Sequence, residues 1–172
     1  MFDLDGDGLS IEQLNASDTF VEMEGDGYGH RTAWVDAGDG VLVLDADGDG
    51  KISDKKEFIF TEWDPGSESD FDALKKGFDT DHDGDLDSGD ARWSDFRIMV
   101  NGQLVTLAAL GVVSIDLTAT GSGQSYGDGS AIAGTSNFTR ADGTTGLVGD
   151  AAFAMEDKGY KIVRTPTTNA DG

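Results

Sequence analysis

The feature that most constrains this chain is a set of aspartates placed on alternate residues and followed by glycine. Three such runs lie at residues 3–8, 45–50 and 79–84, and a degenerate run lies at 22–27. Short carboxylates on alternate residues of a curled loop supply the oxygens that a hard dication requires, and glycine at the sixth position permits the sharp turn. The spacing therefore predicts several EF-hand-like calcium loops, holding two to four Ca²⁺ ions in all.

The charge balance supports this interpretation and excludes several classes of protein. There are 34 acidic and 12 basic residues, which gives a formal net charge of −22. Such an excess opposes compaction unless cations neutralise it. It also excludes nucleic acid as a partner, since phosphates require basic patches. No apolar run approaches the ~20 residues of a membrane span, so we expect no membrane insertion. The absence of cysteine excludes disulfides and thiolate metal sites.

The third loop, residues 79–90, matches the EF-hand spacing best. Its expected ligands occupy positions 1, 3, 5, 7, 9 and 12, which are Asp79, Asp81, Asp83, Asp85, Asp87 and Asp90. Asp85 is expected to contribute its carbonyl oxygen. The segments on both sides have helical spacing, which predicts a helix–loop–helix unit.

The second loop, residues 45–57, begins directly after an apolar strand-like segment. Position 12 is Lys56, which cannot bind a cation, so Glu57 is the expected closing ligand and Asp54 the alternative. The full expected set is Asp45, Asp47, Asp49, Lys51 through its carbonyl, Ser53 and Glu57.

The first loop, residues 3–12, carries three aspartates and a glycine in the same pattern. Its expected ligands are Asp3, Asp5, Asp7, the carbonyl of Leu9, and Glu12 as the nearest closing acid. The degenerate loop, residues 22–28, places Glu22, Glu24 and Asp26 on alternate residues. Asp36 and Asp39 could close it, and a turn that has lost its metal is an equal alternative.

The remaining patterns predict an α+β fold with short helices and small antiparallel hairpins around the calcium loops. Helical spacing occurs at 69–78, strand-like segments at 32–35, 41–44 and 113–117, and hairpin turns at Asn101-Gly102 and Asp142-Gly143. Residues 120–130 are expected to form a Gly/Ser loop. We expect one module over 1–164, with a metal-loop region (1–100), a β-rich region (101–164) and a flexible tail at 165–172.

The order of these motifs resembles the calcium-dependent self-processing module, FrpC type, of secreted RTX proteins and related bacterial adhesins. The resemblance runs from Phe2 to about Met155. It rests on Asp-Leu-Asp-Gly-Asp-Gly at 3–8, Arg-Thr-Ala-Trp-Val at 31–35, the segment 39–50, the third loop, Leu-Ala-Ala-Leu-Gly at 107–111, Ser-Ile-Asp-Leu at 114–117 and Thr-Arg-Ala-Asp-Gly at 139–143.

The resemblance implies calcium-dependent folding, type I secretion to the extracellular space, and self-cleavage at an Asp-Pro bond just before the first loop. Met1 stands at that place here. The Asp64-Pro65 bond lies elsewhere in the chain, and we expect it to be a structural turn.

Three functions are consistent with the sequence. The leading one is a structural calcium module whose partners are other domains of the same large secreted chain. The alternative is an autoprocessing module for an upstream Asp-Pro bond, without enzymatic turnover on other substrates. A third, calcium-dependent glycan binding by an adhesin domain, has no sequence motif of its own.

Overall fold

The computed structural model describes residues 1–22 and 27–162. The tail expected at 165–172, together with Glu24 and Asp26 of the degenerate loop, lies outside these residues. No helix in the described part of the chain is long and apolar enough to cross a membrane.

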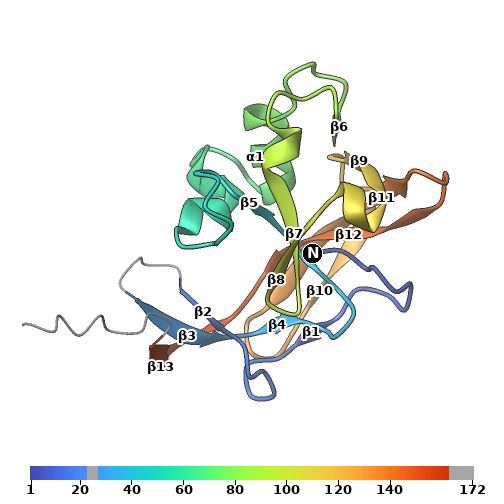
Figure 1. The fold of residues 1–172 in the computed structure, drawn as a ribbon. Coiled ribbons are helices and arrows are strands. Elements are labelled where there is room, and N and C mark those ends of the chain that lie inside the picture. Colours follow the sequence, from blue (N-terminus) through green and yellow to red (C-terminus); the bar gives the residue numbers. More distant parts are fainter. Residues whose placement is uncertain (23–26, 163–172) are drawn as a thin grey trace, which may run out of the picture.

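The largest sheet is built around one long strand. This strand, β11, pairs along one edge with β12 and along the other with β10 and then β9, which in turn pairs with the short β6. All pairings are antiparallel, and Figure 1 shows the resulting curved sheet. The bounds are β6 Asp85–Asp87, β9 Val112–Asp116, β10 Gly121–Ser125, β11 Ala131–Arg140 and β12 Thr145–Ala152.

Three smaller antiparallel sheets complete the β-structure. One has the order β5-β7-β8, another β13-β3-β2, and the third pairs β1 with β4. Their bounds are β1 Ile11–Glu12, β2 Phe20–Val21, β3 Tyr28–Thr32, β4 Trp34–Val35, β5 Val41–Leu44, β7 Phe96–Val100, β8 Gln103–Thr106 and β13 Met155–Ile162.

Helical structure in the described residues is limited to one α-helix and four single 3₁₀ turns. Helix α1 spans Asp70–Gly77, and the Ser69 side chain caps it by accepting a hydrogen bond from the Asp72 amide. This helix confirms the periodicity at 69–78. The 3₁₀ turns are η1 Lys55–Glu57, η2 Phe60–Glu62, η3 Trp93–Asp95 and η4 Ala108–Leu110.

The expected α+β EF-hand fold is wrong, because the module is mostly antiparallel β-sheet. The third loop shows the reason. It is entered from α1, but its second half is β6, where Leu86 is fully buried and pairs with Ile115 of β9. Burial of that side chain against a sheet favours an extended exit over a second helix. The segment 120–130, expected to be a loop, likewise contains β10.

The hairpin turns are where the sequence places them. Asn101 and Gly102 join β7 to β8 with φ values of 49° and 76°, the left-handed pair that a two-residue hairpin requires. Gly143, with φ 85°, turns β11 into β12.

Two apolar clusters fill the module, and β5 lies between them. Leu42 and Leu44 belong to the first cluster, around Phe96 and Phe138, whereas Val41 and Val43 belong to the second, around Trp34. Strand side chains alternate between two faces, so a strand buried on both faces has an uninterrupted apolar sequence. That is why residues 41–44 are four consecutive aliphatic residues.

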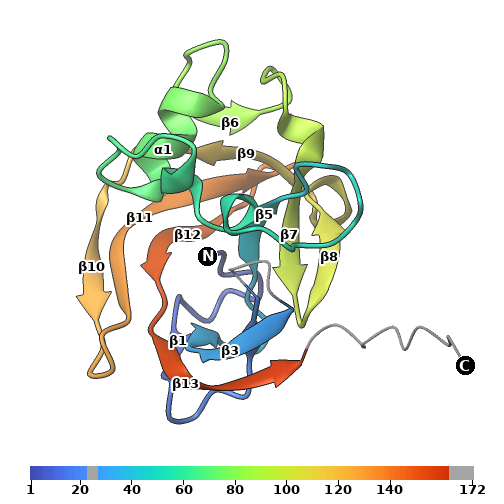
Figure 2. The same cartoon turned by 90° about the vertical axis from the view of Figure 1, so that its left-hand side faces the viewer.

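The first residues of the chain lie between the same two clusters. Met1 packs in the second cluster and Phe2, fully buried, in the first. Phe2 forms bridges with Gly40 and with Val148. A Cβ atom at Gly40 would collide with the Ile98 side chain, so the close approach of Gly40 to Ile98 of β7 favours glycine. In Figure 2 the start of the chain lies beside β12 and β5.

Candidate metal centre

The fold brings three groups of carboxylates together. One oxygen of each residue lies within 4.8 Å of the others in Asp3–Asp5–Asp7–Asp39, in Asp45–Asp47–Asp49 and in Asp79–Asp81–Asp90. Each group belongs to one of the three loops with the alternating aspartate pattern. The structure therefore curls each of these loops so that its carboxylates converge.

The first aspartate of each loop is held by the same main-chain contact. Its carboxylate accepts a hydrogen bond from the glycine amide five residues later, in the pairs Gly8 to Asp3 at 3.2 Å, Gly50 to Asp45 at 3.3 Å and Gly84 to Asp79 at 3.0 Å. These glycines have φ values of 102°, 74° and 96°, a backbone region that favours glycine. The repeated glycine thus bends the loop and supplies a donor that aims the first carboxylate inward.

The second aspartate of each loop accepts a hydrogen bond from the amide two residues later. These pairs are Asp7 to Asp5, Asp49 to Asp47 and Asp83 to Asp81. The third aspartate repeats the contact in the pairs Lys51 to Asp49 and Asp85 to Asp83. Such Asx turns fix each carboxylate over its own loop.

Asp90 closes the third loop. Its Oδ1 accepts a hydrogen bond from the Thr80 amide and its Oδ2 one from the Asp87 amide, at 2.9 Å. The side chain is 6% exposed. One carboxylate therefore ties the second and ninth positions of the loop together beside the Asp79 carboxylate.

Glu57 occupies the equivalent place in the second loop. It accepts hydrogen bonds from the amides of Ala46 at 3.1 Å and Ser53 at 2.8 Å, again the second and ninth positions. The residue is 2% exposed. Asp54, the alternative closing acid, instead caps η1 by accepting from the Lys56 amide.

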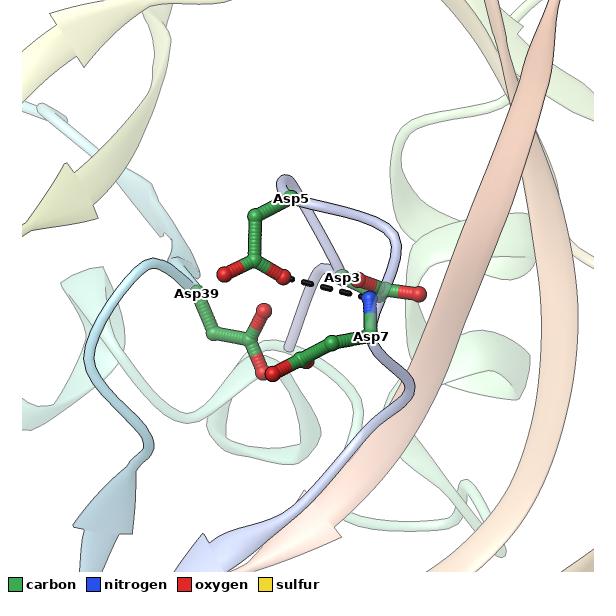
Figure 3. Close-up of side chains that lie close together, drawn as sticks. All are labelled: Asp3, Asp5, Asp7 and Asp39. Carbon is green, nitrogen blue, oxygen red and sulfur yellow. Dashed lines mark hydrogen bonds between the residues drawn. The ribbon is translucent and has the colours of Figure 1, made fainter.

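Asp39 takes this place in the first loop, although it lies far away in the sequence. Its Oδ1 accepts a hydrogen bond from the amide of Leu4, the second position of the loop, at 3.3 Å. Figure 3 shows Asp39 reaching from the segment before β5 toward Asp5 and Asp7. Gly38 has a φ of 103°, a backbone region that favours glycine, and a Cβ atom there would meet the Asp5 carboxylate.

Glu12, the closing acid expected for the first loop, does not join the group. It is an exposed residue of β1 opposite Trp34. In the degenerate loop, Glu22 accepts a hydrogen bond from the Gly27 amide at 2.6 Å, which repeats the five-residue spacing. Asp36 accepts a hydrogen bond from Ser10 Oγ, and Asp39 belongs to the first group of carboxylates. Whether either closes the degenerate loop stays a prediction, because Glu24 and Asp26 lie outside the described residues.

The other expected ligands lie around these groups. Besides Glu12, Glu22 and Glu57, the expected ligands that are described but lie outside the three sets of converging oxygens are Asp83, Asp85, Asp87, Lys51, Ser53 and Leu9. Asp85, Lys51 and Leu9 were expected to contribute carbonyl oxygens, so their side chains need not converge.

Crowding and burial shift the acids toward the neutral form. Burial raises the pKa of Asp39 to about 6, and the charges of Asp3, Asp5 and Asp7 act in the same direction. Hydrogen bonding and charge repulsion from Asp5 raise the pKa of Asp7. In the third loop, burial and the Asp83 charge raise the pKa of Asp81. Without a bound cation, these groups of carboxylates therefore lack nearby positive charge to stabilise their ionised form.

Two buried carboxylate oxygens have no hydrogen-bond partner among the described residues. They are Oδ2 of Asp39 and Oδ1 of Asp79, in residues that are each 3% exposed. An unpaired buried anionic oxygen is costly unless a cation lies beside it. Carboxylate and carbonyl donors without nitrogen or sulfur fit a hard cation such as Ca²⁺, so the residues present fit this metal.

Asp64-Pro65 lies in a turn outside these groups. The Asp64 carboxylate accepts hydrogen bonds from the Gly66 amide and from Ser67 Oγ. Both oxygens of this side chain are thus engaged in the turn.

A β-rich module with EF-hand-like acidic loops is the class of protein that this fold and site define. The SPM domain model matches residues 1–154, and the chain belongs to this family. The family membership agrees with the resemblance of its ordered motifs to self-processing modules. The chain is also 28% identical over 171 residues to the iron-regulated protein FrpA of Neisseria meningitidis serogroup C. The aligned region covers 90% of this chain and 15% of FrpA. The chain thus spans a small part of this curated relative's length.

Sequence reasoning missed Asp39 as a member of the first group. The signal was present, because Asp39 directly precedes Gly40 and a buried strand, as Asp45 directly follows that strand. A spacing rule confined to twelve consecutive residues cannot find a ligand as distant as Asp39, which lies 35 positions beyond Leu4.

Proposed function

We propose that this chain is a calcium-binding structural module whose three acidic loops hold Ca²⁺. The observation that carries the proposal is the pair of buried, unpartnered carboxylate oxygens on Asp39 and Asp79, each within a group of converging acids. When bound, the ion neutralises these carboxylates, and the loops supply the oxygens in positions already fixed by main-chain hydrogen bonds.

Calcium binding of this kind is coupled to folding. The first loop depends on Asp39, and the third loop is joined through β6 to β9. Neither group of acids is assembled in an unfolded chain, so binding free energy becomes folding free energy. The formal charge of −22 adds to the coupling, since the compact state concentrates mutually repelling carboxylates.

Circular dichroism provides the test. Purified protein in EDTA is expected to lose most of its near-UV signal and regain it on addition of Ca²⁺, with Mg²⁺ as the control cation. A near-UV spectrum and a melting temperature that are identical in EDTA and in excess Ca²⁺ would contradict the proposal.

We also propose that the module works outside the cell as part of a larger RTX-type protein, next to other domains of the same chain. The family match and the small share of FrpA that it covers support this setting. Extracellular calcium modules bind with dissociation constants of about 10⁻⁴–10⁻³ M. Titration calorimetry should therefore give constants in or below this range.

Autoprocessing at an upstream Asp-Pro bond is a second candidate function. The family match supports it, and so does the burial of Met1 within the second apolar cluster, from which a preceding peptide would start. In such a reaction the carboxylate oxygen of the aspartate attacks its own carbonyl carbon. The C–N bond breaks, the proline nitrogen takes up a proton, and the cyclic anhydride is opened by water or by a lysine amine.

The test is a chain extended at its N-terminus by a segment containing Asp-Pro. Incubation with Ca²⁺ at neutral pH, followed by mass spectrometry, should give a fragment that begins with proline, and an Asn-Pro version should not. An intact Asp-Pro chain after a day in Ca²⁺, in a sample shown to be folded, would rule out this second function.

A further inference from the structure

A cavity of about 500 Å³ lies beside the first residue of the chain. Its walls are largely apolar, with Phe58, Phe71 and Phe153 among them, and three acids, Glu68, Asp70 and Asp150, also line it. Met1 and Phe2 form part of the same wall. The metal groups described above contribute none of the residues that line this cavity.

Residues 1–3 run antiparallel to β12 in a defined register. The Asp3 amide donates to the Leu147 carbonyl at 3.0 Å, and the Met1 nitrogen donates to the Gly149 carbonyl at 2.8 Å. The Gly149 amide donates back to the Met1 carbonyl at 2.9 Å. Met1 and Gly149 are therefore a hydrogen-bonded antiparallel pair, and Phe2 opposite Val148 is the adjacent non-hydrogen-bonded pair.

The same register fixes where residues before Met1 would pair with β12. Antiparallel pairing advances one strand as the other recedes, so a residue before Met1 would lie opposite Asp150, and the residue before that opposite Ala151. Both Asp150 and Ala151 line the cavity. Continuing the strand therefore leads directly into this space.

Asp70 and Asp150 are joined by a hydrogen bond from the main chain of one to the side chain of the other. The Asp70 amide donates to Oδ2 of Asp150 at 3.1 Å, and Oδ1 of Asp70 accepts a hydrogen bond from the Thr61 amide at 3.3 Å. Burial raises the pKa of both carboxyls, to about 6 for Asp70, and lowers the pKa of the Met1 amino group to about 6. When protonated, the Met1 amino group lowers the pKa of both carboxyls. A peptide bond at Met1 would remove that positive charge and favour the neutral carboxyls further.

We propose that this cavity receives the residues that precede Met1 in a longer polypeptide, as an extended strand that pairs with β12 at Asp150 and Ala151. The continuity of the existing pairing identifies the occupant, and FrpA carries the matching region within a much longer chain. The largely apolar walls fit uncharged side chains. Docking requires no cleavage, so the inference goes beyond both functions proposed above.

Disulfide trapping tests the register, because the chain contains no cysteine. The chain is extended by Ser-Gly-Ser-Cys-Ala before Met1 and combined with Ala151→Cys. Hydrogen-bonded antiparallel partners have Cα atoms ~5.5 Å apart, within the range that a disulfide spans. The matched control carries the same extension with Ala141→Cys, an exposed residue at the other end of the β11–β12 hairpin.

In saturating Ca²⁺ the extended Ala151→Cys variant should form its internal disulfide at least about tenfold faster than the extended Ala141→Cys variant, since pairing raises the effective concentration of the thiols. Equal rates in two folded samples would overturn the proposal. A second measurement uses no cysteine at all. Hydrogen-bonded and non-hydrogen-bonded pairs alternate along an antiparallel ladder, so the Ala151 amide should donate to the docked strand. Its hydrogen exchange should therefore slow several-fold when Ser-Gly-Ser-Ala-Ala is added before Met1. Unchanged exchange would count equally against docking. Both readouts are independent of whether calcium is needed for folding.

Discussion

The amide of Leu4 donates a hydrogen bond to Oδ1 of Asp39, 35 residues further along the chain. The second residue of each of the other two loops makes the same contact, Ala46 with Glu57 and Thr80 with Asp90. In those loops the closing acid is local. In the first loop it is supplied by the segment that leads into β5, so this site links the start of the chain to the centre of the fold.

Asp39→Asn should therefore have opposite effects with and without calcium. With Ca²⁺, loss of one carboxylate charge is expected to weaken binding at the first loop about tenfold, since charge count tunes affinity. In EDTA, the substitution relieves repulsion from Asp3, Asp5 and Asp7, and the melting temperature should be equal or higher. Thermal melts in both conditions measure this. Asp18→Asn, which removes the same charge from an exposed position, should change neither melt appreciably.

Glu57→Gln should destabilise the second loop even without metal. The glutamate accepts hydrogen bonds from three main-chain amides, those of Ala46, Ser53 and Asp54. In glutamine an NH₂ group replaces one of the two carboxylate oxygens, and this group cannot accept a hydrogen bond from the main-chain amides. A buried polar group left unsatisfied in this way costs ~1–3 kcal/mol. Urea unfolding in EDTA measures the loss. Glu62→Gln, which removes only a surface ion pair with Lys55, should cost far less, and an equal loss in both variants would contradict the role assigned to Glu57.

The stability conferred by Asp70 should fall as the pH rises. Its folded pKa of about 6 lies above the usual aspartate value, so the folded state binds the proton more tightly than the unfolded state. The contribution is complete below the unfolded pKa of ~3.9 and is lost as the pH rises through about 6. Asp70→Asn should therefore stabilise the protein by up to ~3 kcal/mol at pH 7.5 and by little at pH 4.

Asp72→Asn, on the same helix, is the matched control for this pH effect. A hydrogen bond from Lys76 lowers the pKa of Asp72, so this substitution should be unfavourable at pH 7.5. Denaturant titrations of both variants across pH, in saturating Ca²⁺, give the comparison. A gain for Asp70→Asn that does not change between pH 4 and 7.5 would show that its carboxyl does not titrate in this interval.

The third loop should matter more than the degenerate loop. Asp79 is buried and carries an unpartnered oxygen within its group, so Asp79→Ala should abolish binding there. Losing a site held at 100 times its dissociation constant costs ~2.7 kcal/mol. Asp83→Ala is expected to act in the same direction. Melting temperatures in excess calcium should fall more for both than for Glu24→Ala, and the reverse order would overturn this ranking of the loops.

Local patterns in the sequence were sufficient where a short segment determines its own structure. Helix α1 follows from the Ser69 cap and the apolar spacing of Phe71, Leu74 and Phe78, and the turn at Asn101-Gly102 follows from the backbone freedom of those two residues. The carboxylates at positions 1 and 3 of each strong loop likewise converge as their spacing predicts.

Features that depend on distant partners could not be predicted in the same way. The exit of the third loop becomes a strand because Leu86 pairs with Ile115, 29 residues on, and a sequence window around residue 86 does not contain that partner. Gly121 to Ser125 has the composition of a loop, yet β11 provides an edge on which it pairs. Asp39 was missed for the same reason, since its role depends on where the N-terminal residues dock.

The position of Phe2 has a consequence for the order of assembly. Phe2 bridges Gly40 and Val148, two residues that are 108 positions apart, and it fills the first cluster while Met1 fills the second. Contacts this distant in sequence form slowly, because closure of the long loops must precede them. A chain that leaves a narrow channel with one end first therefore cannot complete either cluster early, because residues near both ends contribute to each cluster. Its last segment to appear closes the module, whichever direction the chain travels.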